Sequence, residues 1–433
     1  MLKRARLAAV IILSAGPCFS LDVDIPPNDA EPDNPAVIEN SLQLPADGQH
    51  RQQTKSVNSV NIVNHLSFVE RLEIEGGAYN PDLSEQLLSL GLAYYANFDY
   101  APAIAALKRS VFITRVNSGL NNPQQIPINQ QLISAHIGQG NFQQADELQF
   151  YLYRIKTINY TEDMDKTVQA MLDYAEWHRH AFLLNLGKPP HHHLILMHDL
   201  YQQAFEIIST HKGELSMALI PALEGLLSVQ YLLSGYNGEN PEKFQVSMHT
   251  TDNEMASRAE NRLLFLRTSA YKQGRAILKT LHTLHSSDME GPDIAPVEDI
   301  IAAGDWHLWY NEQKSAMTLY REAYLSLLDF NNPKDHLQRY FGSPVELPTN
   351  NRYKSKLLES NYSSTESGGR LLVSFSVSRA GRPYNINVLE SEPETPSRQQ
   401  SRILRDLKTI QFRPRFENGE AVKTENIVKE YVY

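Results

Sequence analysis

The stretch "LSLGLAYYANFDYAPAIAALKRS", Leu88–Ser110, decides the fold of most of this chain. Small and apolar residues recur in it at intervals of three and four, and a short Asn-Phe-Asp segment interrupts them. That spacing places the apolar residues on one face of a helix before the interruption and again after it. The stretch therefore predicts two helices joined by a tight turn.

Two later stretches repeat the pattern: "LISAHIGQGNFQQADELQFYL", Leu132–Leu152, and "AAGDWHLWYNEQKSAMTLYREAY", Ala302–Tyr324. In these units a glycine such as Gly91 or Gly304 lets two antiparallel helices approach closely. A small residue in the second helix (Ala103, Ala145 and Ala316) lets that helix nest against the first. The sequence predicts a helical array over residues 59–332.

This spacing resembles the tetratricopeptide repeat. Phe98 stands where that family prefers glycine, and Ala103 and Ala145 lie 42 positions apart, against about 34 for the family. The resemblance implies a mainly α, TPR-like solenoid, a class that binds peptides or proteins and rarely carries catalysis. An irregular helical bundle is the alternative. The candidates for lining a groove are aromatic, although packing between helices is the other role for each: Tyr94, Tyr95, Tyr100, Trp306 and Trp309.

The C-terminal part of the chain has a different pattern. Residues 371–377 alternate as in a half-buried strand, Ala380-Gly381 predicts a turn, and residues 384–389 predict a second strand. Thr395-Pro396 opens an amphipathic helix. The stretch "TIQFRPRFENGEAV", Thr409–Val422, predicts a short strand and an Asn-Gly turn, and residues 427–433 a last strand. The order is ββαββ, a small α+β unit.

The order and the residues of this unit resemble the TonB C-terminal domain. The matching positions are Val373, Phe375, Val377, Gly381, Val388, Ser391, Pro393, Phe412, Pro414 and Gly419. The sequence departs at Ile410, where the family often has tryptophan, and at Arg415, where it has a small residue. The resemblance implies that an edge strand grips a short segment of an outer-membrane transporter by strand addition.

Carried over by position, that edge comprises Glu425, Asn426, Ile427, Val428, Lys429, Glu430, Tyr431 and Val432. A strand at a sheet edge has unpaired N–H and C=O groups, which an extended peptide can bind. Two alternatives stay open: the strand merely closes the unit, or it pairs with a second copy in a homodimer.

The N-terminus, "MLKRARLAAVIILSAGPCFSLDV", has a basic region followed by an apolar run of signal-peptide length. Cleavage between Ser20 and Leu21 would remove Cys18, the only cysteine. Lipoprotein processing at Cys18 is an alternative, and a retained membrane anchor is another. The expected location is the periplasm of a Gram-negative bacterium. The predicted parts are a signal peptide (1–20), a flexible Pro/Asp/Asn-rich spacer (21–58), the helical repeat domain (59–332), a linker (333–367) and the TonB-like domain (368–433).

The net charge of -10 argues against a nucleic-acid partner. The stretch His178–His198 is rich in histidine, but consecutive histidines after Pro189-Pro190 point in different directions, which favours a solvated loop and helix start over a metal site. No catalytic residue, metal or cofactor is predicted, because the chain has no GxSxG, HExxH or phosphate-binding loop. The expected function is a non-enzymatic periplasmic protein-interaction adaptor that contacts outer-membrane transport proteins. The alternatives are a TPR scaffold with a structural C-terminal domain, an anchored TonB-type energy transducer, and an enzyme hidden in the array.

Overall fold

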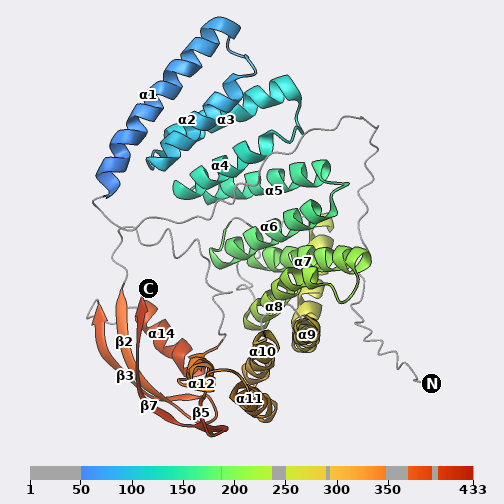
Figure 1. Cartoon of the computed structure of the whole chain (residues 1–433), viewed down its shortest axis with the longest axis vertical. Coiled ribbons are helices and arrows are strands. Elements are labelled where there is room, and N and C mark those ends of the chain that lie inside the picture. The colour runs from blue at the N-terminus through green and yellow to red at the C-terminus, as the bar shows by residue number, and fades with distance from the viewer. Residues whose placement is uncertain are drawn as a thin grey trace, which may run out of the picture. The chain divides into compact units, whose positions relative to one another are not determined.

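The computed structural model of the chain describes residues 50–186, 188–236, 250–288, 293–347, 369–392 and 398–432. These residues form a mainly helical protein with a small region of strands near the C-terminus (Figure 1). The predicted signal peptide with its Ser20–Leu21 cleavage site, residues 21–49 of the spacer and residues 348–367 of the linker lie outside the described residues.

The residues from Asn61 onward form one compact unit, and the described residues 50–60 belong to a first unit that ends at Val60. Helix α1 (His50–Gly76) begins in the first unit and continues into the second. Residues 50–58, which the sequence analysis placed in the flexible spacer, therefore belong to a helix. The reason is local composition, because the prolines of the spacer end at Pro45 and none follows before Pro81.

The helices of the second unit follow one another with short connections. They are α2 (Leu83–Ala96), α3 (Tyr100–Ser118), α4 (Gln125–Gly138), α5 (Phe142–Asn159), α6 (Met164–Leu183), α7 (Pro190–Lys212), the 3₁₀ turn η1 (Met217–Leu219), α8 (Ile220–Gly235), α9 (Thr250–Ser287), α10 (Ala295–Trp309), α11 (Gln313–Leu328) and α12 (Pro333–Phe341). From α2 to α11, each helix packs against the next one along the chain.

The predicted helix pairs of the three repeated stretches are present as α2–α3, α4–α5 and α10–α11. Phe98 lies in the turn between α2 and α3 with a φ of 64°, a left-handed conformation that glycine adopts more readily. The alanines of the second helices, Ala103, Ala145 and Ala316, are completely buried. Their burial agrees with the close contacts between helices that the spacing of small residues predicts.

Gly304 marks the closest approach of α10 to α11. A Cβ added there would lie 2.5 Å from Cε1 of Tyr320, whose side chain is completely buried. We expect Gly304→Ala to lower the free energy of unfolding by about 1–3 kcal/mol, because overpacking outweighs the better helix propensity of alanine. Urea unfolding followed by circular dichroism measures this change. Gly235→Ala is the matched control, since a Cβ there meets nothing within 4 Å; equal stabilities of the two variants would contradict the close contact.

Helix α8 is the centre of the largest hydrophobic cluster. Leu223, Leu226 and Leu227 are almost completely buried in it. Within the described residues, one stretch, Met217–Gly235, is long and apolar enough to cross a membrane, and 61% of it is buried inside the protein. Most of this stretch therefore packs inside the protein's own core.

The C-terminal strands form three small sheets. β2 (Arg370–Val377), β3 (Pro383–Glu392) and β7 (Thr424–Val432) make an antiparallel sheet in the order β3-β2-β7. The short strands pair as β1 (Val345–Glu346) with β4 (Phe412–Arg413), and as β5 (Arg415–Glu417) with β6 (Glu420–Val422). Helix α14 (Arg398–Thr409) contributes Leu407 to a core with Val373 and Phe375 of β2.

The predicted linker, 333–367, starts with ordered structure. Pro333 occupies the first turn of α12, where its missing N–H is not needed. Phe341 and Leu347 are buried in one cluster with Phe416 of β5 and with residues of α10 and α11. Accordingly, Asn61–Tyr433 is a single compact unit, in place of the separate repeat and C-terminal domains that the sequence analysis predicted.

A buried ion pair joins β4 to α10. The guanidinium of Arg413 donates from Nε and Nη2 to the two carboxylate oxygens of Asp305, each at 3.0 Å. Nη1 of Arg413 donates to the carbonyl of Tyr340 at 3.0 Å, and the hydroxyl of Tyr320 donates to Asp305 at 2.8 Å. Burial alone would lower the pKa of Arg413, but the attraction of Asp305 outweighs it and raises that pKa. The strands are thereby fixed to the last helices of the array.

Candidate functional site

Strand β7 contains the predicted edge residues, Glu425–Val432. It pairs antiparallel with β2, with Ile427 opposite Phe375 and Tyr431 opposite Leu371. Among the described residues no strand pairs with its other side, so β7 is an edge of the sheet. Because backbone N–H and C=O groups of a strand point alternately to its two sides, half of the β7 groups face away from β2.

The side chains of β7 alternate between the two faces of the sheet. Ile427 and Tyr431 are half-buried against the core formed with α14. Val428 and Glu430 point to the opposite face and are exposed, with Val428 55% exposed. This alternation leaves an apolar side chain beside the unpaired edge.

Polar contacts hold β7 in place at several points. On the inner face, Lys429 and Tyr431 both contact the carboxylate of Glu346 in β1. Burial and this carboxylate raise the pKa of Tyr431 above its ordinary value. On the exposed side, Arg370 of β2 lies 3.3 Å from Glu430. Residue pairing with β2 becomes irregular near Asn426, which has a φ of 57°, so the regular part of the edge begins at Ile427.

The aromatic groove candidates lie in two separate places. Tyr94, Tyr95 and Tyr100 are half-buried around α2 and α3, and the ring of Tyr100 packs over Gly138 of α4. Trp306 is completely buried, and its indole N–H donates to the carbonyl of Tyr271 at 3.1 Å. The prediction that Trp306 lines an exposed groove is therefore wrong. Its ring instead fills the space above Gly274.

Trp309 is half-buried, and its indole N–H donates to the hydroxyl of Ser234 at 2.7 Å. Its ring lies 5.8 Å from that of Tyr231 in α8. Both the ring and the indole N–H of Trp309 therefore make contacts between helices. The structure brings neither tryptophan together with the three tyrosines.

The histidine-rich stretch contains the predicted helix start, because α7 begins at Pro190, but it holds a buried pair of histidines rather than a solvated loop. His178 of α6 and His193 in the first turn of α7 are both completely buried, with their Nδ1 atoms 2.9 Å apart. Nε2 of His193 lies 3.0 Å from the carbonyl of Leu186, and a carbonyl accepts only, so this nitrogen carries the proton. Neutral His193 then accepts at Nδ1 from the Nδ1–H of His178.

Burial, with repulsion from His193, lowers the pKa of His178 to about 3. His198 lies in a different network, described below. Within the described residues no group of three or more histidine, cysteine, aspartate or glutamate side chains is arranged to hold a metal ion.

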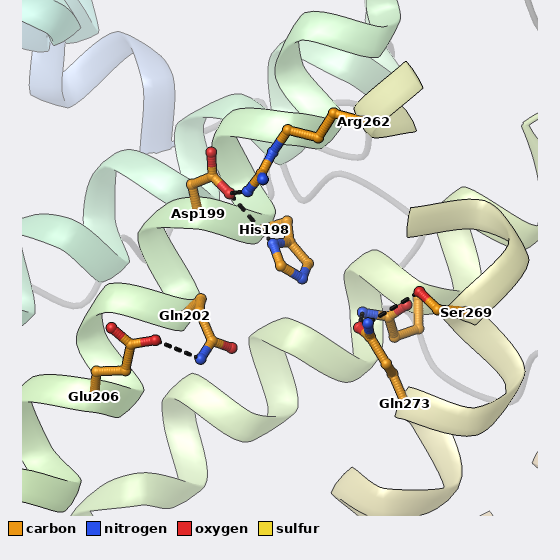
Figure 2. A network of polar contacts seen from close by, with 8 residues as sticks. His198, Asp199, Gln202, Glu206, Arg262, Ser269 and Gln273 are labelled. Atoms are coloured by element: carbon orange, nitrogen blue, oxygen red, sulfur yellow. Dashed lines mark hydrogen bonds and ion pairs between the residues drawn. The ribbon is translucent and has the colours of Figure 1, made fainter. Parts of the chain in front are cut away.

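Figure 2 shows a polar network where α7 meets α8 and α9. Ser269 donates to the carbonyl of Leu266, so its oxygen accepts from Nε2 of Gln273 at 3.0 Å. The carbonyl oxygen of Gln273 then accepts from Nε2 of Gln230 at 3.1 Å. This chain of donors fixes the orientation of both amides and leaves Oε1 of the completely buried Gln230 without a partner among the described residues.

The α7 side of the network presents acceptors too. Nδ1 of His198 lies 3.3 Å from the carboxylate of Asp199, which also binds Arg262. Nε2 of Gln202 donates to Glu206 at 2.8 Å. Nε2 of His198 and Oε1 of Gln202 have no hydrogen-bond partner among the described residues (Figure 2). Acceptors of this kind are satisfied by water or by a ligand donor. Ser269, the one hydroxyl drawn, binds an amide and a carbonyl rather than a base, so the network has no arrangement for nucleophilic catalysis.

Sequence reasoning missed a cavity of about 410 Å³ between α9, α10 and α11. Lys272, Arg275 and Lys279 of α9 line it. Their spacing of three and four residues places them on one helix face, a signal that was readable in the sequence. The sequence does not indicate which helices lie opposite that face.

Comparisons with known proteins add little to this geometry. The chain matches no protein-family model and no curated protein. Among solved structures it is similar to the crystal structure of BtubC (BKLC) from P. vanneervenii, with 12% sequence identity and a TM-score of 0.37. That similarity covers 65% of this chain and 93% of the other.

Proposed function

We propose that this chain is a non-enzymatic protein-interaction adaptor of the bacterial periplasm. In this proposal the β7 edge binds an extended segment of an outer-membrane transport protein as an additional strand, as in the TonB C-terminal domain. The helical array, similar to tetratricopeptide repeats, holds a second partner. The observation that supports the proposal is the position of β7, which pairs on one side with β2 and has no strand on its other side among the described residues.

The chemistry of the edge favours strand addition. Ile427–Glu430 pair with β2 one residue after another, so the groups on their far side are spaced for a β-ladder. Val428 offers an apolar contact for a side chain of the added strand, and Glu430 on the same face places a carboxylate near it. Main-chain bonds give affinity in this mode, and neighbouring side chains give specificity.

A scaffold with a purely structural C-terminal unit is the second candidate. The Arg413–Asp305 pair favours it, because that pair attaches the strands to the array whether or not β7 binds a partner. The two candidates differ in the state of the outward-facing β7 amides.

Amide hydrogen exchange of the full chain separates them. The adaptor predicts that alternate amides from Ile427 to Val432 exchange fast in the free protein and slow down when the partner is bound. Complete protection of these amides in the partner-free protein, at concentrations where it is monomeric, would contradict the adaptor and leave the structural role.

The identity of the partner is tested by photo-crosslinking in cells. A photoreactive amino acid at Glu430 is expected to form adducts with outer-membrane transport proteins, identified by mass spectrometry. Val428→Lys is expected to lower the adduct yield about tenfold, the effect of losing about 1.4 kcal/mol at the contact. Leu389→Lys, an equally exposed leucine on β3 at the opposite edge, is the control and should leave the yield unchanged. Adducts only with a second copy of this chain would instead identify β7 as a homodimer edge.

A further inference from the structure

The cavity between α9, α10 and α11 has a positively charged wall. Lys272, Arg275 and Lys279 line it from α9, and none of the three forms an ion pair among the described residues. The chain as a whole has a net charge of -10, so a cluster of cations without ion-pair partners runs against its composition. Basic side chains that share one wall of a cavity repel one another, and an anion between them removes that cost.

Two carboxylates also line the cavity, fewer than the three cations. Asp299 of α10 binds Nδ1 of His285 at 2.7 Å, and burial raises the pKa of Asp299. Glu322 of α11 is the other carboxylate in the lining, and it is exposed. A positive field is also felt by His307, whose pKa is lowered by burial and then by the charge of Arg275.

The remaining lining of the cavity is apolar. Ile300, Ala303 and Trp306 contribute to it from α10, and Leu319 from α11. A volume of about 410 Å³ is in the range of sites for small molecules. The cavity thus combines a cationic wall with an apolar floor, on which Ile300, Ala303 and Leu319 are partly exposed.

We propose that this cavity binds a small organic anion, in which a carboxylate, sulfonate or phosphate group contacts Arg275 and Lys279 and an aliphatic or aromatic body lies over Ile300 and Leu319. Arg275 offers a planar fork of donors that matches an oxyanion, and Lys272 and Lys279 add charge on either side of it. This inference goes beyond the proposed adaptor function and does not depend on β7.

The test uses two fluorescent probes with the same apolar body. 1-Anilinonaphthalene-8-sulfonate is anionic, and N-phenyl-1-naphthylamine is its uncharged counterpart. We expect the anion to bind the full chain at least tenfold more tightly than the uncharged probe, with an affinity that falls as salt is added.

Variants assign the site. The double variant Arg275→Gln/Lys279→Gln is expected to weaken binding of the anionic probe about tenfold or more, as expected for lost charge-assisted contacts, and to leave the uncharged probe unaffected. Both side chains are exposed, so the fold is expected to persist. Lys108→Gln, an exposed lysine on α3, is the control. Equal weakening by the control, or no weakening by the double variant, would overturn the proposal.

Competition then separates possible sources of the anion. Benzoate, which has both a charge and an apolar body, is expected to displace the probe, and inorganic phosphate at the same concentration is expected to do so at least tenfold less well. A short peptide rich in glutamate tests whether acidic side chains compete. Displacement by that peptide alone would overturn a site for small organic anions.

Discussion

Replacing Asp305 with alanine is expected to lower the free energy of unfolding by about 3–5 kcal/mol. The substitution leaves the guanidinium of Arg413 buried, with 7% of its side chain exposed, and without a carboxylate. It also removes the acceptor of the Tyr320 hydroxyl. The effect is large because the buried charge of Arg413 has lost its hydration, and without Asp305 no opposite charge compensates for that loss. Urea unfolding at pH 7, followed by tryptophan fluorescence, measures it.

Two further variants make this prediction specific. Glu425→Ala removes the exposed ion pair with Lys423 and is expected to cause no measurable change. The double variant Asp305→Ala/Arg413→Met is expected to be more stable than Asp305→Ala alone, because no charge is left buried. A cost below about 1 kcal/mol for the single variant would mean that water reaches Arg413 and that the strands are not fixed to α10 by this pair.

The second large effect is a loss of stability in acid caused by His178. An unfolded histidine binds its proton near pH 6.5, whereas His178 in the folded protein binds it near pH 3. Between these values the unfolded chain holds one more proton than the folded chain, so the free energy of unfolding falls as the pH is lowered. The slope is about 1.4 kcal/mol per pH unit, and this contribution is constant above about pH 7.

His178→Phe removes the titrating group and keeps a ring beside Tyr174, which lies 4.4 Å away in an edge-on contact. We expect the pH dependence of stability between pH 6 and pH 4 to be smaller in this variant by about one proton. At pH 8 His178 is neutral in both the folded and the unfolded chain. Unfolding at this pH therefore gives the stability difference between the variant and the parent chain that is independent of titration. Equal slopes for the variant and the parent chain would show that His178 takes up a proton without unfolding.

Several local features could be predicted from the sequence. The small residues at Ala103, Ala145 and Ala316 indicated helix pairs, and those pairs are present as α2–α3, α4–α5 and α10–α11. The alternation of residues 371–377 indicated β2. The predicted Asn418-Gly419 turn is present, but it joins β5 to β6 rather than leading to the last strand. These features depend on neighbours in the chain, and local periodicity records them directly.

Other features depend on residues far apart in the sequence. Arg413 was not singled out, because its partner Asp305 is more than a hundred positions away and a lone arginine gives no pattern. The consecutive histidines after Pro189-Pro190 favour a solvated loop and helix start, yet the packing of α6 on α7 buries both His178 and His193. Trp306 was predicted to line a groove. The glycine beneath its ring, Gly274, lies on another helix, so no local pattern indicates that contact.

The sequence by itself determined that the chain is mainly helical, that a small group of strands ends it, and that its last strand has an alternating pattern. Periodicity carries that information because helices and strands repeat within a few residues. Only the tertiary structure decided that β7 is an edge, that the strands are fixed to α10 through Arg413, and that three cations of α9 share a cavity. These relations depend on which surfaces meet, and that is set by the packing of the whole chain rather than by any short stretch of it.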